Sequence, residues 1–149
     1  MAAYFLDTSA VVKRYVQEIG TFWTRELADP AAGHFLYIAR ITDVELTAAI
    51  ARRRHGASLN PAQALAALNQ FRQDFARDYR ILEITIPLLQ WAAQLADSYA
   101  LRAYDAVQLA AALEVRANVP ALTMISADAA LNAAASGEGL PIDDPNTHP

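Results

Sequence analysis

The sequence predicts an α/β fold in which a small parallel sheet of four to five strands is covered by helices on both faces. Two observations indicate this three-layer α/β/α architecture: short apolar segments alternate with longer helical patterns, and each short segment is apolar throughout rather than at every second residue. Such strands are typical of parallel sheets, because these are buried on both faces. The chain has 149 residues and no linker-like stretch, so we expect a single domain over residues 1–149.

Each predicted strand is a run of about three or four apolar residues next to polar or turn-forming residues. The first run ends directly before Asp7, and the third contains one acidic residue, Glu83. In chain order the predicted strands are residues 4–6, 35–38, 81–84 and 122–125, with a short edge strand at 140–142.

The predicted helices lie between these strands, and glycine and proline mark many of their ends. Gly20 and Gly56 each close a helical pattern, Pro30 stops another, and Pro61 begins one because the first turn of a helix tolerates proline. The predicted helices are the stretch between Ser9 and Gly20 and residues 21–28, 41–54, 61–75, 87–99, 104–116 and 129–135.

The composition excludes several classes of protein. The absence of cysteine excludes a disulfide scaffold and a cysteine-ligated zinc site. Neither a long uncharged apolar segment nor a signal-peptide pattern is present, so we expect a cytoplasmic protein without membrane contact. Twelve basic against sixteen acidic residues give a net charge of −4, which argues against a protein that coats nucleic acid. The three histidines (His34, His55 and His148) are expected at the surface.

Four acidic residues lie where this architecture brings chain segments to one edge of the sheet, beyond the carboxyl ends of the strands. Asp7 and Asp128 each follow a strand and precede a helix, and Asp105 lies at the head of an apolar helix. Glu45 lies in a helix that is apolar on nearly every side, where a lone charge is costly. Ordinary roles stay open for each: a helix cap for Asp7 and Asp128, a cap or dipole partner for Asp105, and an ion pair with Arg52 or another arginine for Glu45.

Together these four acids predict a site for a divalent cation. Four carboxylates in one pocket repel one another, and a divalent cation is the ordinary way to neutralise them. Oxygen ligands without cysteine or suitably spaced histidine favour magnesium or manganese over zinc. Setting the four acids aside leaves twelve acidic and twelve basic residues, so the whole charge excess belongs to the predicted site.

Four segments of the chain, in their order and spacing, resemble the PIN-domain ribonucleases, and among these the VapC-type toxins of type II toxin–antitoxin pairs. The matching segments are Leu6-Asp7-Thr8-Ser9 followed by Lys13 and Tyr15, Thr42-Asp43-Val44-Glu45-Leu46, Tyr104-Asp105-Ala106-Val107-Gln108-Leu109-Ala110, and Ser126-Ala127-Asp128 with Leu131. The resemblance implies that Asp7, Glu45, Asp105 and Asp128 are the catalytic and metal-binding acids. Asp7 and Asp105 are its most dependable metal ligands.

The resemblance further implies a magnesium- or manganese-dependent endoribonuclease that acts as a toxin and inhibits translation and growth. Its expected partners are an RNA substrate, a VapB-like antitoxin and a second copy of the chain. Thr8, Ser9 and Ser126 are expected as supporting hydroxyls, although capping the first helix is the more ordinary role for Thr8 and Ser9. Many family members carry a further acid shortly after the position of Asp128, and this chain does not, which predicts one tightly held ion.

Basic and aromatic residues give weaker signals. Lys13 and Arg102 are candidates for contact with substrate phosphate, and a solvated surface position is an equally ordinary role for either. The run Arg52–His55 is most simply a charge match to a helix C-terminus, with RNA contact as the alternative. The large aromatic residues Trp23, Trp91, Phe71 and Phe75 are expected to pack rather than to stack on bases.

Three other functions compete with the ribonuclease toxin. The chain could be a PIN-like nuclease that is not a toxin, or a catalytically silent α/β module that binds another protein. A phosphatase or receiver domain also places an aspartate after its first strand. Such domains require a second acid or a phosphoacceptor beside that aspartate, such as another aspartate two residues later. This chain has Ser9 at that position.

Overall fold

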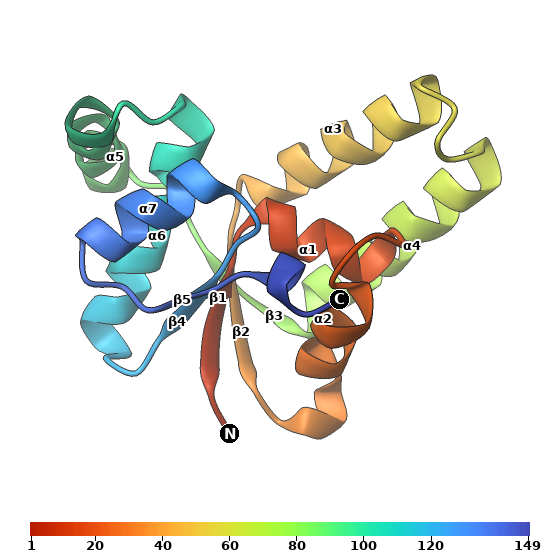
Figure 1. The fold of residues 1–149 in the computed structure, drawn as a ribbon, viewed down its shortest axis with the longest axis horizontal. Coiled ribbons are helices and arrows are strands. Elements are labelled where there is room, and N and C mark those ends of the chain that lie inside the picture. The colour runs from red at the N-terminus through yellow and green to blue at the C-terminus, as the bar shows by residue number, and fades with distance from the viewer.

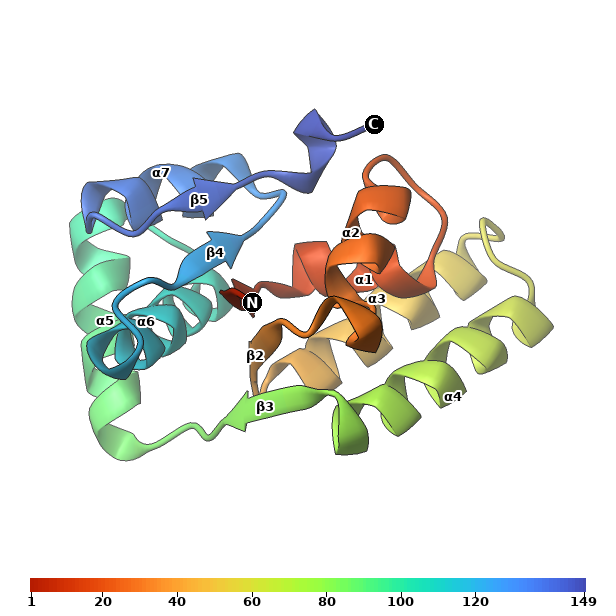
Figure 2. The same ribbon diagram turned by 90° about the horizontal axis from the view of Figure 1, so that it is seen from below.

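The sheet has five parallel strands, in a computed structural model that describes all residues 1–149. The strands follow the spatial order β3-β2-β1-β4-β5, which Figure 2 shows along the edge of the sheet. They are β1 (Ala3–Leu6), β2 (Phe35–Ala39), β3 (Tyr79–Leu82), β4 (Thr123–Ile125) and β5 (Ile142–Asp143). The predicted parallel sheet, including its short last edge strand, is therefore confirmed.

Seven helices cover the sheet in two layers (Figure 1). The first four helices lie on one face and the last three on the other, which confirms the three-layer α/β/α arrangement. No helix combines the length and hydrophobicity that crossing a membrane requires. The helices are α1 (Thr8–Tyr15), α2 (Thr21–Ala28), α3 (Thr42–His55), α4 (Pro61–Arg77), α5 (Ile86–Tyr99), α6 (Ala103–Asn118) and α7 (Ala129–Gly137), with 3-10 turns at Pro30–Ala32 and Pro145–Thr147.

Two hydrophobic cores, one on each face, hold the layers together. Neighbouring residues of β1 enter different cores: Phe5 packs with α5, α6 and α7, and Leu6 packs with α1, α3 and α4. Both side chains are fully buried. This explains why the strands are apolar at every position, since side chains alternate between two buried faces.

Several element boundaries differ from the prediction by two or more residues, and two of these differences have a clear structural cause. The third strand begins two residues earlier, at Tyr79, because the Tyr79 ring is buried in the core and its hydroxyl contacts Arg14 and Tyr15. The first helix ends at Tyr15 rather than near Gly20. Gly20 instead precedes α2 with a φ of 84°, and a Cβ there would lie 2.3 Å from the carbonyl oxygen of Pro145.

The strand order creates a switch point between β1 and β4. After β1 the chain adds β2 and β3 on one side, and it later adds β4 and β5 on the other. The amide of Asp7 donates to the carbonyl of Ile125 at 3.0 Å, so the segments that leave β1 and β4 start side by side. In open parallel sheets the crevice outside this point is the ordinary binding site.

Candidate active site

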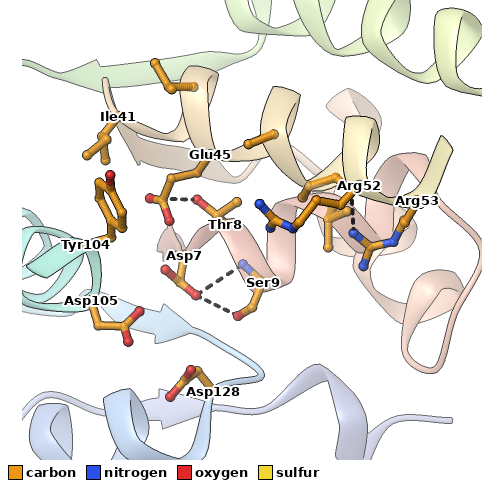
Figure 3. Close-up of a pocket in the computed structure, with 14 residues that line it drawn as sticks. Asp7, Thr8, Ser9, Ile41, Glu45, Arg52, Arg53, Tyr104, Asp105 and Asp128 are labelled. Atoms are coloured by element: carbon orange, nitrogen blue, oxygen red, sulfur yellow. Dashed lines mark hydrogen bonds between the residues drawn. The ribbon is translucent and has the colours of Figure 1, made fainter. Parts of the chain in front are cut away.

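A pocket of about 420 Å³ lies at the carboxyl edge of the sheet and collects all four predicted acids. Figure 3 shows Asp7 between Glu45 on one side and Asp105 and Asp128 on the other. Residues 60 or more positions apart in the chain therefore meet in one pocket. The remaining lining residues are Thr8, Ser9, Val12, Ile41, Val44, Ala48, Ala49, Arg52, Arg53 and Tyr104.

Asp7 is the most buried of the four acids, with 4% of its surface exposed. Its Oδ2 accepts hydrogen bonds from the amide of Ser9 at 3.1 Å and from the hydroxyl of Ser9 at 2.6 Å, so it caps α1. Burial raises its pKa from 3.8 to about 6 against the opposing effect of the Ser9 bonds, and the charges of Glu45 and Asp105 raise it further. Asp7 is thus a helix cap and a pocket carboxylate at once.

The hydroxyls of Thr8 and Ser9 contact carboxylates rather than capping the helix. Ser9 Oγ donates to Asp7 and accepts from the amide of Ala127 at 2.9 Å, which joins the segments after β1 and β4. Thr8 Oγ1 donates to Oε1 of Glu45 at 3.2 Å. The expectation that both mainly cap α1 is wrong, because the Asp7 side chain takes that position.

Glu45 is half-buried and is held by uncharged donors. Its Oε1 accepts from the side-chain amide of Gln108 at 2.7 Å and from Thr8. No arginine forms an ion pair with it, so the predicted alternative of a bridge to Arg52 is wrong. Burial raises the pKa of Glu45 because the Gln108 and Thr8 bonds do not fully offset it, and the charge of Asp105 adds to the rise.

The surroundings of Glu45 are less apolar than expected. Helix α3 buries one face through Leu46 and Ile50, but Val44 next to Glu45 is 69% exposed. Glu45 therefore lies at the border between the buried face and the open pocket. This position explains how its carboxylate can be held at one oxygen and still face a ligand.

Asp105 and Asp128 close the other side of the pocket. Asp105 lies in the first turn of α6, where the helix dipole favours a negative charge. Burial and the charge of Asp128 raise the pKa of Asp105, and Arg102 opposes this. Asp128 caps α7, since its Oδ1 accepts from the amide of Leu131 at 2.9 Å.

The chemistry of this donor set fits a divalent cation. Four carboxylates face the pocket, and three of them have raised pKa values because their charges are buried together without a paired base. Oxygen donors of this kind suit magnesium or manganese. No three acidic or histidine side chains of the chain lie close enough together to hold a metal ion as they stand.

Three other predicted residues lie outside the pocket lining. Ser126 is buried and accepts from the amide of Asp128 at 3.2 Å, so it shapes the turn before α7. The Lys13 ammonium is buried and bonds to the carbonyl of Ile19 at 2.8 Å and to Glu18, which corrects its predicted access to substrate. Arg102 is exposed at the start of α6 and acts on Asp105 through its charge.

Gln108, Thr42 and Tyr104 were not predicted as site residues, and Arg52 was predicted only as part of a basic run with RNA contact as the alternative role. Gln108 and Thr42 are fully buried and bond to one another behind Glu45. Tyr104 is 60% exposed on the pocket wall, and Arg52 lines the pocket without an acidic partner. Helical spacing carried part of this signal, because Arg52 lies seven residues after Glu45 and Gln108 three after Asp105, and such spacings share a helix face.

A carboxylate-lined pocket at the switch point of a parallel sheet is the ordinary place for a ligand-binding site in an open α/β protein. The chain belongs to the PIN domain family, whose sequence profile matches residues 4–136. This confirms the resemblance found in the sequence. No curated protein matches the chain significantly.

Solved structures with the same fold include a toxin–antitoxin complex and a toxin. FitAcB from Neisseria gonorrhoeae has a TM-score of 0.67 at 20% identity, covering 95% of this chain and 97% of that one. VapBC2 from Rickettsia felis, bound to a fragment of its promoter DNA, has a TM-score of 0.65 at 14% identity, covering 95% and 98%. VapC20 from Mycobacterium tuberculosis, a toxin that cleaves the sarcin–ricin loop, has a TM-score of 0.63 at 18% identity, covering 88% and 94%.

The raised pKa of Asp7 predicts that the substitution Asp7→Asn stabilises the metal-free chain. A carboxyl with a pKa of about 6 folded and 3.8 unfolded stabilises the fold fully below about pH 4, and this contribution is lost as the pH rises through 6. Urea unfolding in the presence of a chelator should show Asp7→Asn more stable than the wild type by about 2–3 kcal/mol at pH 7.5. The difference should shrink below pH 5.

Asp29→Asn is the matched control for this prediction. Asp29 also caps a helical turn, accepting from the amide of Ala31 at 2.8 Å, but it is exposed and lies outside the pocket. Its substitution should change stability by no more than about 0.5 kcal/mol at either pH. An Asp7→Asn variant that is less stable than the wild type at pH 7.5 would show that the cap matters more than the buried charge.

Proposed function

We propose that the chain is a magnesium- or manganese-dependent endoribonuclease. The observation that carries this proposal is the convergence of Asp7, Glu45, Asp105 and Asp128 in one pocket of a PIN domain. These four carboxylates would hold the cation, which lowers the pKa of an attacking water and offsets charge on the phosphate in such hydrolases. Among the chain's own residues, Ser9 fixes the carboxylate of Asp7 and Thr8 that of Glu45.

Two other side chains in the pocket support a nucleic-acid strand as the substrate. The guanidinium of Arg52 has no acidic partner and lies two helical turns beyond Glu45, where it can bind a phosphate. Tyr104 offers an exposed ring next to Asp105 on which a base can stack. Because stacking requires an unpaired base, these residues favour a single-stranded region of nucleic acid.

Substitution of either central acid should abolish cleavage. Asp7→Asn and Asp105→Asn each remove one negative ligand of the proposed cation, and we expect magnesium-dependent cleavage of a labelled single-stranded RNA to fall by at least about 100-fold. A DNA strand of the same sequence should be cut more slowly. Gel analysis of 5′-labelled substrate with and without a chelator measures both effects.

Asp97→Asn is the control, because Asp97 lies on the exposed side of α5 away from the pocket. It should cleave as fast as the wild type. Retained cleavage in folded Asp7→Asn or Asp105→Asn protein would exclude this site. A wild-type chain that cuts neither RNA nor DNA with magnesium or manganese would favour the alternative of a catalytically silent interaction module.

Arg52→Ala should weaken substrate binding more than it slows the chemical step. Loss of one phosphate contact worth about 1 kcal/mol corresponds to a KM about fivefold higher with kcat nearly unchanged. Arg54→Ala is the control, since Arg54 is exposed near the end of the same helix but does not line the pocket. Equal effects of the two variants would show that only the general positive charge of this helix end matters.

We further propose that the chain is a cytoplasmic toxin with a VapB-like antitoxin and that it forms a homodimer. Family membership supports this role, as do a toxin–antitoxin complex and a toxin of the same fold. The homodimer is supported by exposed apolar residues on α5, Ile86 at 74% and Leu89 at 48% exposure. A PIN-like nuclease outside any toxin–antitoxin pair remains the alternative.

Growth and light-scattering measurements test these proposals. Induced expression of the wild-type chain should arrest bacterial growth, Asp105→Asn should not, and a DNA-binding protein encoded directly upstream should relieve the arrest. Light scattering at several concentrations should give twice the chain mass, and Leu89→Glu should shift it to the monomer because a buried charge is costly. Normal growth with full RNase activity would favour a nuclease that is not a toxin.

A further inference from the structure

Gln108 stands out as a buried polar residue to which the sequence analysis assigned no role. Its side chain is fully buried in α6, one turn after Asp105, and it reaches both α1 and α3. Its amide nitrogen lies 2.7 Å from Oε1 of Glu45, 3.1 Å from Oγ1 of Thr42 and 3.2 Å from Oγ1 of Thr8. The shortest of these contacts is to the carboxylate.

We propose that Gln108 is the positioning residue that holds Glu45 in the orientation in which it binds the divalent cation. This inference rests on the proposed function, since it assigns a role toward the cation of that site. Both bonds to the Glu45 carboxylate, from Gln108 and Thr8, reach Oε1, which leaves Oε2 available to the pocket. A carboxylate anchored at one oxygen loses little conformational freedom when its other oxygen binds a ligand.

The orientation of the Gln108 amide supports this role. Its carbonyl oxygen is buried and has no hydrogen-bond partner, which is unfavourable. Rotating the amide would offer that carbonyl to the hydroxyls of Thr8 and Thr42 but would place it against the Glu45 carboxylate. In the observed orientation the carbonyl oxygen of Gln108 has no partner, and its NH2 group donates to Glu45. The bond to Glu45 therefore accounts for the orientation of the amide.

Packing alone does not explain a glutamine at this position. The neighbouring α6 residues Val107, Leu109 and Ala110 are apolar and buried, and an apolar side chain could fill the same space. Gln108 also joins the helix that carries Asp105 to the helix that carries Glu45. The bond therefore fixes two of the four carboxylates relative to each other.

The test is the affinity of the chain for Mn²⁺, measured without RNA by electron paramagnetic resonance of free Mn²⁺. Gln108→Met keeps length and volume but removes the donor, and it should weaken Mn²⁺ binding by about 10- to 100-fold. Cleavage should fall at low Mn²⁺ and recover at high Mn²⁺, with the KM for RNA unchanged. Gln70→Met is the matched control, because it removes an amide bond to a different carboxylate, that of Asp74, and should bind Mn²⁺ as the wild type does.

A double-mutant cycle separates positioning from a structural defect. If Gln108 acts through Glu45, then Gln108→Met should change Mn²⁺ affinity less than twofold in a Glu45→Gln background. Effects that multiply would overturn the inference. If Gln108→Met does not fold, Gln108→Asn keeps a buried amide that is too short to reach Glu45 and should show the same loss.

Two further results would overturn the inference in distinguishable ways. A folded Gln108→Met or Gln108→Asn protein with wild-type Mn²⁺ affinity would remove the positioning role and leave the proposed nuclease intact. A wild-type chain that does not bind Mn²⁺ would remove the cation from the proposed function and this inference with it.

Discussion

Unpaired negative charge at the edge of the sheet is the constraint on which this site depends. Asp7, Glu45 and Asp105 carry raised pKa values because their charges are partly buried and face one another. Two nearby bases are held elsewhere, since Glu18 binds both Lys13 at 3.3 Å and Arg53 at 3.2 Å. The charges of Arg52 and Arg102 oppose the rise in pKa at Glu45 and Asp105 without reversing it. The pocket lining thus carries four carboxylates against the two guanidinium groups of Arg52 and Arg53, so it keeps a net negative charge.

The same acids also stabilise the fold. Asp7 and Asp128 cap α1 and α7, and Asp105 lies in the favourable first turn of α6. A helix that starts at the carboxyl edge of a parallel sheet directs its first amides toward that edge, so a capping carboxylate is already close to the ligand. The ordinary role and the functional role of these acids are therefore compatible, and neither excludes the other.

Most of the fold could be predicted from the sequence because its signals are local. Apolar runs of three to five residues and the glycine or proline beside them define β1, β2, β4 and most helices. The start of β3 was shifted because Tyr79 is buried and its hydroxyl contacts Tyr15 of α1, which lies 64 residues away in the chain. The end of α1 was also wrong, since Gly20 serves a close approach to Pro145 rather than ending a helix.

The site was predictable only in part, for a related reason. Position after a strand identified Asp7 and Asp128, and position in an otherwise apolar helix identified Glu45 and Asp105. What fixes Glu45 in place was invisible, because Gln108 lies 63 residues away and reads as one polar residue in an apolar helix. An acidic residue in an apolar helix indicates that its carboxylate needs a partner, but the sequence does not show which residue that partner is. Here the answer is two uncharged donors rather than an arginine, and that difference leaves the charge of Glu45 in the pocket instead of cancelling it.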